Sequence, residues 1–541
     1  MLGAEFQIAA SGKFWQLSLM NRLEKIQLLK NVGSSWFALG VNILVGLFLS
    51  PFILHRLGDT AFGIWILIFS LTGYYGIFDF GIRSSIIRYV SKFAATKNIE
   101  EASELINTAL FAYTGIGLLT FMITVAGSIY IDRLFQIPPG FQSTARWLFL
   151  IVGSSVALTF PLGVFGGILE GLQKFYVINW TNIFFSGFLR PILIVFFLHR
   201  GYGLLTIALI TVGLPIVASI IRGVVALQAL PLRFSPRYIS RNAVRQIANY
   251  SGITFIIIVA TRLKSKTDAV IIGSFLSPAA ITYFYSGSRL LDYAAEVVSS
   301  LAQIFVPMSS QSEAVGDKDR LRKIFVAGNR ACALVTLPMT AAFLILGKSI
   351  IEVWLGKRYT AQGYAVLLTL IIPYTLMLTQ LASGRVLYGI SKHGKVAIIT
   401  MIEAAANVFL SVLLVRPFGI VGDALGTAIP LAATYIFFMP FHLCSLLRIR
   451  VSSFLRQAFL LPVLLALPPA IVLLLMRRWF IPHTYRELII QMLTAGAVYA
   501  VLLAWAHRAG KLLAVGDLAL PRGAAAHDPT PLPAIESYSE D

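Results

Sequence analysis

The sequence predicts an all-α polytopic membrane protein of about fourteen transmembrane helices, and three observations lead to this fold class. Of the 541 residues, 57% are hydrophobic and only 13% are charged, whereas an ordinary soluble domain carries about 25% charged residues. The mean hydropathy is +0.80. Apolar runs of the roughly 20 residues that a bilayer-spanning helix needs recur along the chain.

The first predicted element is residues 1–31, an N-terminal amphipathic segment. Its stretch Phe14–Lys30 alternates apolar and basic residues at helical spacing, so we expect it to lie on the cytoplasmic membrane surface. No short apolar region with a small-residue cleavage site is present, and we predict no removable signal peptide. Residues 32–246 then form a first lobe of six spans, with these approximate bounds: Val32–Leu54, Ala61–Gly81, Leu105–Ile129, Ala145–Ile168, Ile178–Leu198 and Leu204–Ala226.

Residues 247–450 are predicted to form a second lobe of six spans, and residues 451–508 add two further helices. The tail, residues 509–541, ends in a Pro-rich and acidic stretch that we expect to be disordered and cytoplasmic. The eight spans have these approximate bounds: Tyr250–Leu276, Ile281–Met308, Val326–Leu346, Tyr364–Leu387, Val396–Val415, Ala424–Leu446, Leu455–Met476 and Leu488–Trp505.

The distribution of basic residues predicts the orientation. With a cytoplasmic N-terminus, 28 of the 44 Lys and Arg fall on the inner side, 11 fall on the outer side, and five lie inside spans. This bias follows the positive-inside rule and predicts that both termini are cytoplasmic. The formal charge of +20 is therefore better explained by membrane topology than by nucleic-acid binding.

Several functional classes lack their sequence signals. Cys332 and Cys444 both lie in apolar runs and show neither a disulfide framework nor metal-ligand spacing. The seven His form no HExxH pair, and no GxxxxGK[ST] loop occurs. No loop exceeds about thirty residues, so the chain has no room for a soluble catalytic domain. We predict no metal, no cofactor and no enzyme activity.

An internal duplication appears when the chain is compared with itself at a shift of about 217 residues. Asn31–Gly33 matches Tyr250–Gly252, and ILEGLQK at Ile168–Lys174 matches VLYGISK at Val386–Lys392. The stretch GLLTIA after Tyr202 matches GIVGDA after Phe418. Each unit holds six spans, an even number, so the two copies are parallel repeats. Such repeats pack about an axis along the membrane normal, with the binding site between them.

Three stretches resemble a known family. KNVGSSWFALGVNILVGLFLSPFILHRLGDTAFGIW (Lys30–Trp65), FDFGIRSSIIRYVSK (Phe78–Lys92) and ILEGLQKFYVIN (Ile168–Asn179) are similar to bacterial lipid-linked oligosaccharide flippases. These transporters for O-antigen and exopolysaccharide form the polysaccharide branch of the multidrug/oligosaccharidyl-lipid/polysaccharide (MOP) exporter superfamily. The resemblance covers nearly the whole chain through the twelfth span. It implies two six-helix lobes, alternating access and an undecaprenyl-pyrophosphate-linked oligosaccharide as cargo. It also implies the bacterial inner membrane, contact with membrane lipids, and polysaccharide-assembly proteins such as a glycan polymerase as partners.

The most polar stretch inside a predicted span is TRLKSKTD, which ends at Asp268. A cation at the bilayer centre costs roughly 2.5–3.5 kcal/mol, so Arg262, Lys264 and Lys266 should face a polar interior. On a helix, Arg262 and Lys266 share one face, whereas Lys264 and Asp268 are i,i+4 neighbours that can neutralise each other. We therefore predict that Arg262 and Lys266 bind the cargo pyrophosphate, which guanidinium and ammonium groups suit. A structural ion-pair network is the alternative.

Arg289, Asp292 and Glu296 form a second polar stripe, in the eighth span. Arg289 is a further head-group candidate, although Asp292 can pair with it locally at i,i+3. Asp292 and Glu296 are expected to form structural or gating ion pairs.

The remaining charged candidates lie apart from these stripes. Arg190 precedes Pro191, where we expect a kink; it could bind the head group, pair with Asp79 or stabilise the kink. Asp79 and Arg83 are i,i+4 neighbours, and we favour a salt bridge at the cytoplasmic gate. Glu403 stands alone in the eleventh span and is a candidate coupling-ion site, although a structural carboxyl is the favoured interpretation.

Three rival functions stay open at this point. A cation-coupled multidrug exporter (MATE type) of the same superfamily should have an acidic or aromatic cavity, whereas the seventh span carries three bases and one acid at mid-membrane. A flippase for a lipid-linked peptidoglycan precursor would share the fourteen-span plan. A membrane glycan polymerase is less favoured, because such enzymes tend to carry a sizeable outer loop.

Overall fold

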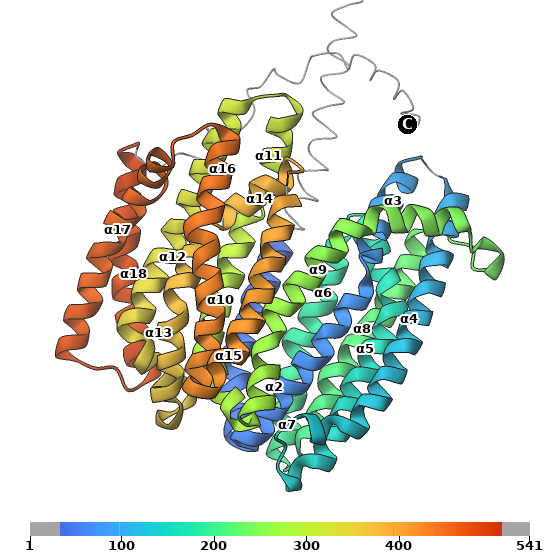
Figure 1. Ribbon diagram of the computed structural model, residues 1–541, viewed down its shortest axis with the longest axis horizontal. Helices are drawn as coiled ribbons and strands as arrows, with labels where there is room; N and C mark the ends of the chain where they lie inside the picture. The colour runs from blue at the N-terminus through green and yellow to red at the C-terminus, as the bar shows by residue number, and fades with distance from the viewer. Residues whose placement is uncertain (1–32, 97, 393, 511–541) are drawn as a thin grey trace, which may run out of the picture.

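The computed structural model describes residues 33–510 except 97 and 393, with only the backbone at 94, 95, 248–254 and 256. Within this part every regular element is a helix and no strand occurs (Figure 1). A backbone inside a bilayer must satisfy its own hydrogen bonds, and a helix does so within one segment. The predicted all-α membrane fold is confirmed. The predictions for residues 1–31 and for the tail beyond Gly510 lie outside the described residues.

The first half of the molecule runs from the first described helix to the connector before α9. In chain order its elements are Gly33–Leu57, α2 (Asp59–Gly73) with the 3₁₀ turn η1 (Tyr74–Asp79), α3 (Ile82–Thr96), α4 (Ile99–Leu134), η2 (Pro139–Phe141), α5 (Gln142–Gly171), α6 (Phe175–Asn182), the π-helical η3 (Ile183–Leu189), α7 (Arg190–His199), α8 (Leu204–Ala229) and η4 (Pro236–Tyr238).

The second half begins with the long helix α9, and two further helices follow it. Their bounds are α9 (Arg241–Phe275), α10 (Pro278–Ala302), α11 (Phe305–Ala314), α12 (Lys318–Leu355), α13 (Lys357–Thr379), α14 (Leu381–Gly389), α15 (Gly394–Ala433), the π-helical η5 (Thr434–Phe438), α16 (Met439–Leu447), α17 (Val451–Trp479) and α18 (Tyr485–Arg508).

The number of spans agrees with the sequence prediction. Twelve helical segments of the described chain are long and apolar enough to cross a membrane. One of them, Gly394–Leu447, is bent at Gly419, whose φ of 59° is not helical, so it supplies two crossings. The 35-residue α9 is long enough to cross but carries too many charges to qualify by composition. Together with α9, and with that segment counted twice, the spans number fourteen.

The helices of the two halves follow the same order. Helix starts recur at an offset of 219 residues: Asp59 and Pro278, and Ile99 and Lys318. This order agrees with the predicted duplication. Figure 1 shows α3 to α8 on one side and α10 to α16 on the other, with α17 and α18 at the outer edge of the second half. An even number of spans puts Gly33 and Gly510 at the same end of the bundle, which we call the N/C end; the opposite end is the far end.

The two halves are in close contact at the far end. A Cβ added to Gly63 of α2 would lie 1.7 Å from the carbonyl oxygen of Pro278 in α10, so only glycine allows this approach. The largest cluster of buried apolar side chains joins α2 to α10 and α13, and includes Ile64, Leu67, Leu291 and Leu367. Because this cluster extends across both halves, it forms one continuous apolar core between them.

Candidate functional site

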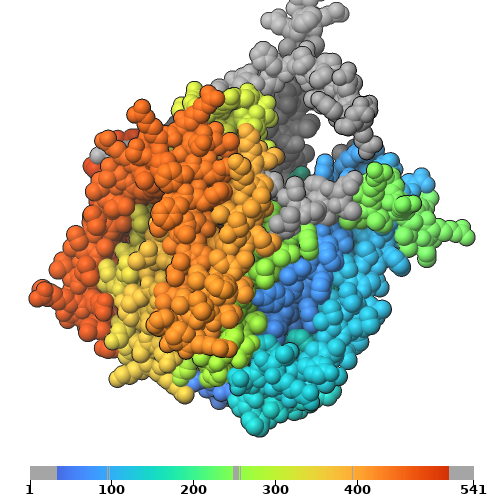
Figure 2. All heavy atoms as spheres, in the orientation of Figure 1, coloured from blue at the N-terminus to red at the C-terminus, as the bar shows by residue number. Residues whose placement is uncertain are grey.

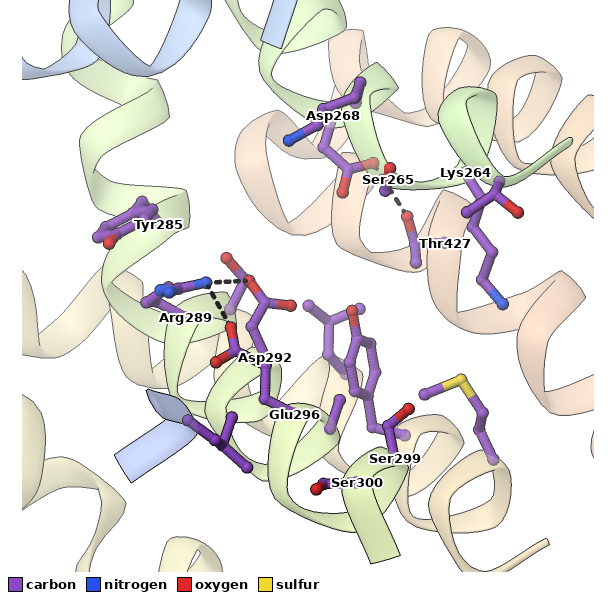
Figure 3. Close-up of a pocket in the computed structure, with 18 of the residues that line it drawn as sticks. Lys264, Ser265, Asp268, Tyr285, Arg289, Asp292, Glu296, Ser299, Ser300 and Thr427 are labelled. Atoms are coloured by element: carbon purple, nitrogen blue, oxygen red, sulfur yellow. Dashed lines mark hydrogen bonds and ion pairs between the residues drawn. The ribbon is translucent and has the colours of Figure 1, made fainter. Parts of the chain in front are cut away.

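A cavity of about 1390 Å³ lies between the two halves. It extends from the middle of the bundle to the N/C end, which it reaches at Ser35, Phe175 and Met308. The first half lines it with the first helix, α2 and α6, and the second half with α9, α10, α11, α13 and α15. Figure 3 draws 18 of its lining residues and labels ten, most of them on α9 and α10.

The polar wall of the cavity is a stripe along α10. Its lining residues follow helical spacing and alternate hydroxyl, charged and amide groups: Tyr285, Ser288, Arg289, Asp292, Glu296, Ser299, Ser300 and Gln303. The Arg289 guanidinium lies 3.7 Å from Asp292 and 3.5 Å from Glu296 (Figure 3). Its centre lies 4.2 Å from the Tyr293 ring centroid. The contact with Asp292 is the local i,i+3 pair that the sequence allowed, and the contact with Glu296 is added by the structure.

The predicted pair of Lys264 and Asp268 is wrong. The Lys264 ammonium lies 2.5 Å from the carboxylate of Glu403 in α15. Glu403 is only 5% exposed, and a carboxylate buried to this extent needs a cation in contact with it, which Lys264 supplies from the neighbouring helix. Glu403 is therefore not the isolated carboxyl that the sequence suggested.

Asp268 instead belongs to a buried polar group between α9 and α15. The Thr427 hydroxyl donates a hydrogen bond to its carboxylate at 3.2 Å, and the Asn407 amide donates to Thr427 at 2.6 Å. Asp423 is fully buried beside them, and neither of its carboxylate oxygens has a hydrogen-bond partner among the described residues. The Asn407 amide oxygen is also buried without a partner in that part of the chain.

Arg262 and Lys266 share one face of α9, as the helical spacing predicted. A Cβ placed on Gly76 would lie 2.7 Å from the Arg262 Nε, and one on Gly73 would lie 3.0 Å from the Lys266 Cε. Both side chains thus lie against the turn from α2 into η1. Lys266 also lines the cavity, whereas Arg262 is not among the lining residues. Within the described residues, neither cation lies within 4.0 Å of a carboxylate oxygen.

The predicted pair of Asp79 and Arg83 is also wrong. Arg83 binds the Glu170 carboxylate of α5 at 2.6 Å, and Asp79 accepts a hydrogen bond from the Tyr113 hydroxyl of α4. The two residues are separated by the irregular backbone at Phe80 and Gly81, where φ is positive, so they are not on one continuous helix. Each side chain therefore turns to a different neighbouring helix.

Arg190 does not pair with Asp79, and it is not a cavity-lining residue. It begins α7 directly after the π-helical segment η3, so the backbone irregularity expected at Pro191 is a π-helix. Its Nε is buried without a hydrogen-bond partner among the described residues.

The cavity is not the basic chamber that the seventh span alone suggested. Six ionisable residues line it, three bases and three acids: Lys264, Lys266, Arg289, Asp268, Asp292 and Glu296. The acids on α10 balance the cations on α9 and α10. Of the three lining cations, Arg289 and Lys264 are in ion pairs, so Lys266 is the one without a carboxylate partner in the described part of the chain.

A polar network closes the far end of the cavity. Asp59, at the start of α2 and 8% exposed, accepts from Arg358 at 2.8 Å, from Tyr283 at 3.3 Å and from Tyr359. The Thr282 hydroxyl donates to the Asp59 backbone oxygen at 2.8 Å. All four donors belong to the second half, so this one aspartate links the halves.

Several residues of this site were not found from the sequence. Asp59 and Asp423 lie just before the predicted starts of their spans, at Ala61 and Ala424, so neither was counted among the charged residues inside the membrane. The serines of α10 were not singled out. The stripe on α10 did have a signal, because its polar residues recur every three to four positions. The pairing of Glu403 with Lys264 had none, because it depends on how α15 packs on α9.

Residues 53–362 match the family described as polysaccharide biosynthesis protein. The chain belongs to this family. Among its relatives, the putative O-antigen transporter of Shigella flexneri is 18% identical over 409 residues, which are 75% of this chain and 95% of that protein.

Two solved structures share the fold of this polysaccharide biosynthesis protein. The lipid II flippase MurJ, in an inward closed conformation, matches with a TM-score of 0.64 and 17% identity over 88% of this chain and 98% of that one. An inward-facing MATE multidrug transporter of the MOP superfamily matches with a TM-score of 0.64 and 15% identity over 76% and 94%. The chain therefore has the fold of these two transporters, and the family, the relative and the fold agree with the resemblance to polysaccharide flippases of the MOP superfamily seen in the sequence.

Proposed function

We propose that this protein moves an undecaprenyl-pyrophosphate-linked oligosaccharide across the bacterial inner membrane during cell-surface polysaccharide biosynthesis, with O-antigen or exopolysaccharide as the end product. The observation that carries the proposal is the cavity between the halves. It reaches the N/C end and is closed at the far end. Moving a pyrophosphate and several sugars through hydrocarbon unaided costs many kcal/mol, and a polar cavity removes most of that cost.

The size and lining of the cavity suit a glycan. Its volume of about 1390 Å³ exceeds the roughly 300–1,000 Å³ of common small-molecule sites. Serine hydroxyls and the Gln303 amide offer hydrogen bonds to sugar hydroxyls, while Trp36, Tyr285 and Tyr374 offer aromatic faces. The lining is neutral in formal charge, so it favours a polar cargo over a strongly cationic drug.

The pyrophosphate is assigned to Lys266. Its ammonium group is the lining cation without a carboxylate partner in the described residues, and charge-assisted hydrogen bonds to phosphate are the strong ones. Arg289 is a second contact, which the cargo reaches by displacing Asp292 or Glu296. Arg262 lies one turn before Lys266 on the same face of α9, against η1. It reaches the pyrophosphate as a third cation if α9 moves away from η1. Arg190, which is remote from the lining, is the least supported of the four sequence candidates.

The direction of transport follows from the two ends. We propose that the N/C end is cytoplasmic, as the basic bias predicts, so the cargo enters there. Release needs the Asp59 network to separate, which lets the far end open while the N/C end closes. The polyprenyl tail stays in the lipid during this change.

The coupling cation is assigned to Asp268 and Asp423. The fully buried Asp423 carboxylate has no hydrogen-bond partner among the described residues, and burying such a charge costs many kcal/mol unless a proton or a metal ion neutralises it. Asp423, Asn407 and Thr427 supply oxygen atoms of the kind that sodium or a proton would use, and Asp268 opens onto the cavity. Glu403 is excluded from this role because Lys264 already neutralises it.

The experiment that tests the proposal is mass spectrometry of lipids that co-purify with the full-length protein. Polyprenyl-pyrophosphate oligosaccharides should be enriched over the bulk membrane, and Lys266→Ala should lose most of that enrichment at equal protein level. Enrichment of a peptide-bearing precursor would instead identify a cell-wall-precursor flippase. Absence of any polyprenyl-linked glycan, together with energy-dependent efflux of a cationic dye, would replace the proposal by a drug exporter.

A further inference from the structure

The connector between the halves carries four arginines on the surface of the N/C end. Arg233 and Arg237 lie between α8 and α9, and Arg241 and Arg245 lie in the first two turns of α9. All four side chains are exposed, and no acidic residue occurs between Arg222 and Lys264. Among the described residues, no carboxylate oxygen lies within 4.0 Å of their guanidinium groups.

Three large apolar side chains are interleaved with these arginines. Phe234, Ile239 and Val244 are 46%, 39% and 52% exposed. Exposing three large apolar side chains to water is unfavourable, so a loop surrounded only by water would not be stabilised by this alternation of apolar and basic residues. Basic and apolar residues on one surface are typical of segments that lie in the membrane interface, where cations meet headgroups and apolar groups enter the acyl boundary.

The opposite face of the connector is fixed to the first half. Leu230, Ala243 and Ile247 belong to the apolar core formed with α3, α4 and α5. The buried side chains of Ser103, Asn107 and Thr108 in α4 hydrogen-bond the connector backbone. Thus Asn107 donates to the Arg233 carbonyl oxygen at 2.7 Å, while the backbone N–H of Ser240 donates to Thr108 at 3.1 Å.

These bonds hold the arginines outward before any ligand arrives, and a preorganised surface binds with a smaller entropic cost. Figure 1 shows the first turns of α9 lying across the N/C end of the first half before the helix descends between the halves. Figure 2 shows the same connector protruding sideways beyond α4, at the green edge of the molecule.

We propose that this connector surface binds anionic phospholipid headgroups of the leaflet at the N/C end. Charge complementarity indicates this ligand, because four arginines with no neighbouring acid attract the phosphate of the headgroup. The apolar side chains between them can insert among the lipid chains beneath that phosphate. The start of α9 is held by the first half, whereas its later turns pack on α15 in the second. Lipid bound at the connector therefore holds the first half at the leaflet. Helix α9, which starts at this connector, also carries Lys266, the residue proposed to bind the cargo.

The test uses the full-length protein in detergent, examined by native mass spectrometry with added phosphatidylglycerol or phosphatidylcholine. Phosphatidylglycerol should bind in preference to phosphatidylcholine. Each cation near an anionic surface contributes roughly fivefold in affinity, so Arg237→Gln/Arg241→Gln should weaken phosphatidylglycerol binding roughly 25-fold. Phe234→Ser/Val244→Ser should weaken both lipids alike, because it removes apolar insertion without changing the charge.

The matched control is Arg448→Gln/Arg450→Gln, which removes two exposed arginines at the same end of the second half. It should leave the preference for phosphatidylglycerol within twofold of the unmodified protein. Equal loss in both double variants would show a general charge effect and overturn the proposal. So would unchanged phosphatidylglycerol binding in Arg237→Gln/Arg241→Gln, or equal displacement by soluble glycerol phosphate, which would indicate a free-phosphate site. None of these outcomes depends on which cargo the cavity carries.

Discussion

The two halves of the molecule share a helix order but line the cavity with different chemistry. The second half contributes all six ionisable lining residues, which lie on α9 and α10. The first half contributes serines and apolar or aromatic residues such as Ser70, Ile66 and Trp36. Equivalent helices therefore pack in the same order, while only the second half places charged groups at the cavity.

The charged residues of the first half serve other contacts. Arg83 binds Glu170 between α3 and α5, and Arg222 donates to Thr181 and to Asn182 at 2.6 Å. Asp59 is the exception, since it closes the far end against the second half. The first half thus uses its charged residues for packing and for the single contact of Asp59 with the second half, whereas the second half supplies every charged residue of the cavity lining.

The largest expected effect comes from the ion pair between Lys264 and Glu403. Lys264→Met leaves the buried Glu403 without a cation, and we expect the free energy of unfolding to fall by about 2–3 kcal/mol. Thermal unfolding in detergent measures it. Lys264→Met/Glu403→Gln should recover most of the loss, because no orphan charge remains. A large loss in Asp268→Asn with none in Glu403→Gln would restore the local pair that the sequence suggested.

Next in size is the effect of Lys266 on transport. A charge-assisted contact to phosphate contributes on the order of 1.5–3 kcal/mol, so Lys266→Ala should weaken cargo binding roughly ten- to a hundredfold. Glycan display in cells lacking their own transporter, normalised to protein level, measures it. Arg190→Ala, in the first half and remote from the cavity, should transport normally. Equal loss in both variants would remove the contrast between the halves.

The carboxylates at α9 and α15 should control energy coupling. Asp423→Asn removes the charge that a sodium ion or proton neutralises, and we expect the rate increase caused by an imposed gradient to fall by about tenfold. Transport in proteoliposomes with an imposed sodium or proton gradient measures the effect. Asp132→Asn, which changes an acid paired with Arg146 at the far end of the first half and outside the cavity lining, is the control. A full response to both gradients in Asp423→Asn would refute the assignment.

The smallest effect is expected for Arg83 in the first half. Its pair with Glu170 is 45% exposed on the arginine side, and exposed pairs contribute about 0–1 kcal/mol. Arg83→Gln should therefore shift the unfolding midpoint little and leave glycan display intact. A complete loss of display at normal protein level would place a cargo contact in the first half. It would contradict the view that only the second half supplies charged groups to the cargo.

Much of the fold was predictable from the sequence. Apolar length gave the spans, because a helix must be about 20 residues long to cross the bilayer and must satisfy its own backbone. Self-comparison predicted a duplication, and the helix starts recur at an offset of 219 residues. The i,i+3 and i,i+7 spacing put Arg289, Asp292 and Glu296 on one stripe and allowed the pair of Arg289 with Asp292, since all three lie on one regular helix. It also predicted the shared face of Arg262 and Lys266.

Pairings between helices were decided only by the tertiary structure. Spacing along one helix lists possible partners, but a buried carboxylate takes the cation that packing brings nearest. Glu403 therefore binds Lys264 from another span, Arg83 turns to Glu170, and Asp268 joins Thr427. The sequence by itself determined which segments enter the membrane and which of them carry charge. Which charges face the cavity, and which neutralise one another, depends on the distances between helices, and no spacing along the chain encodes those distances.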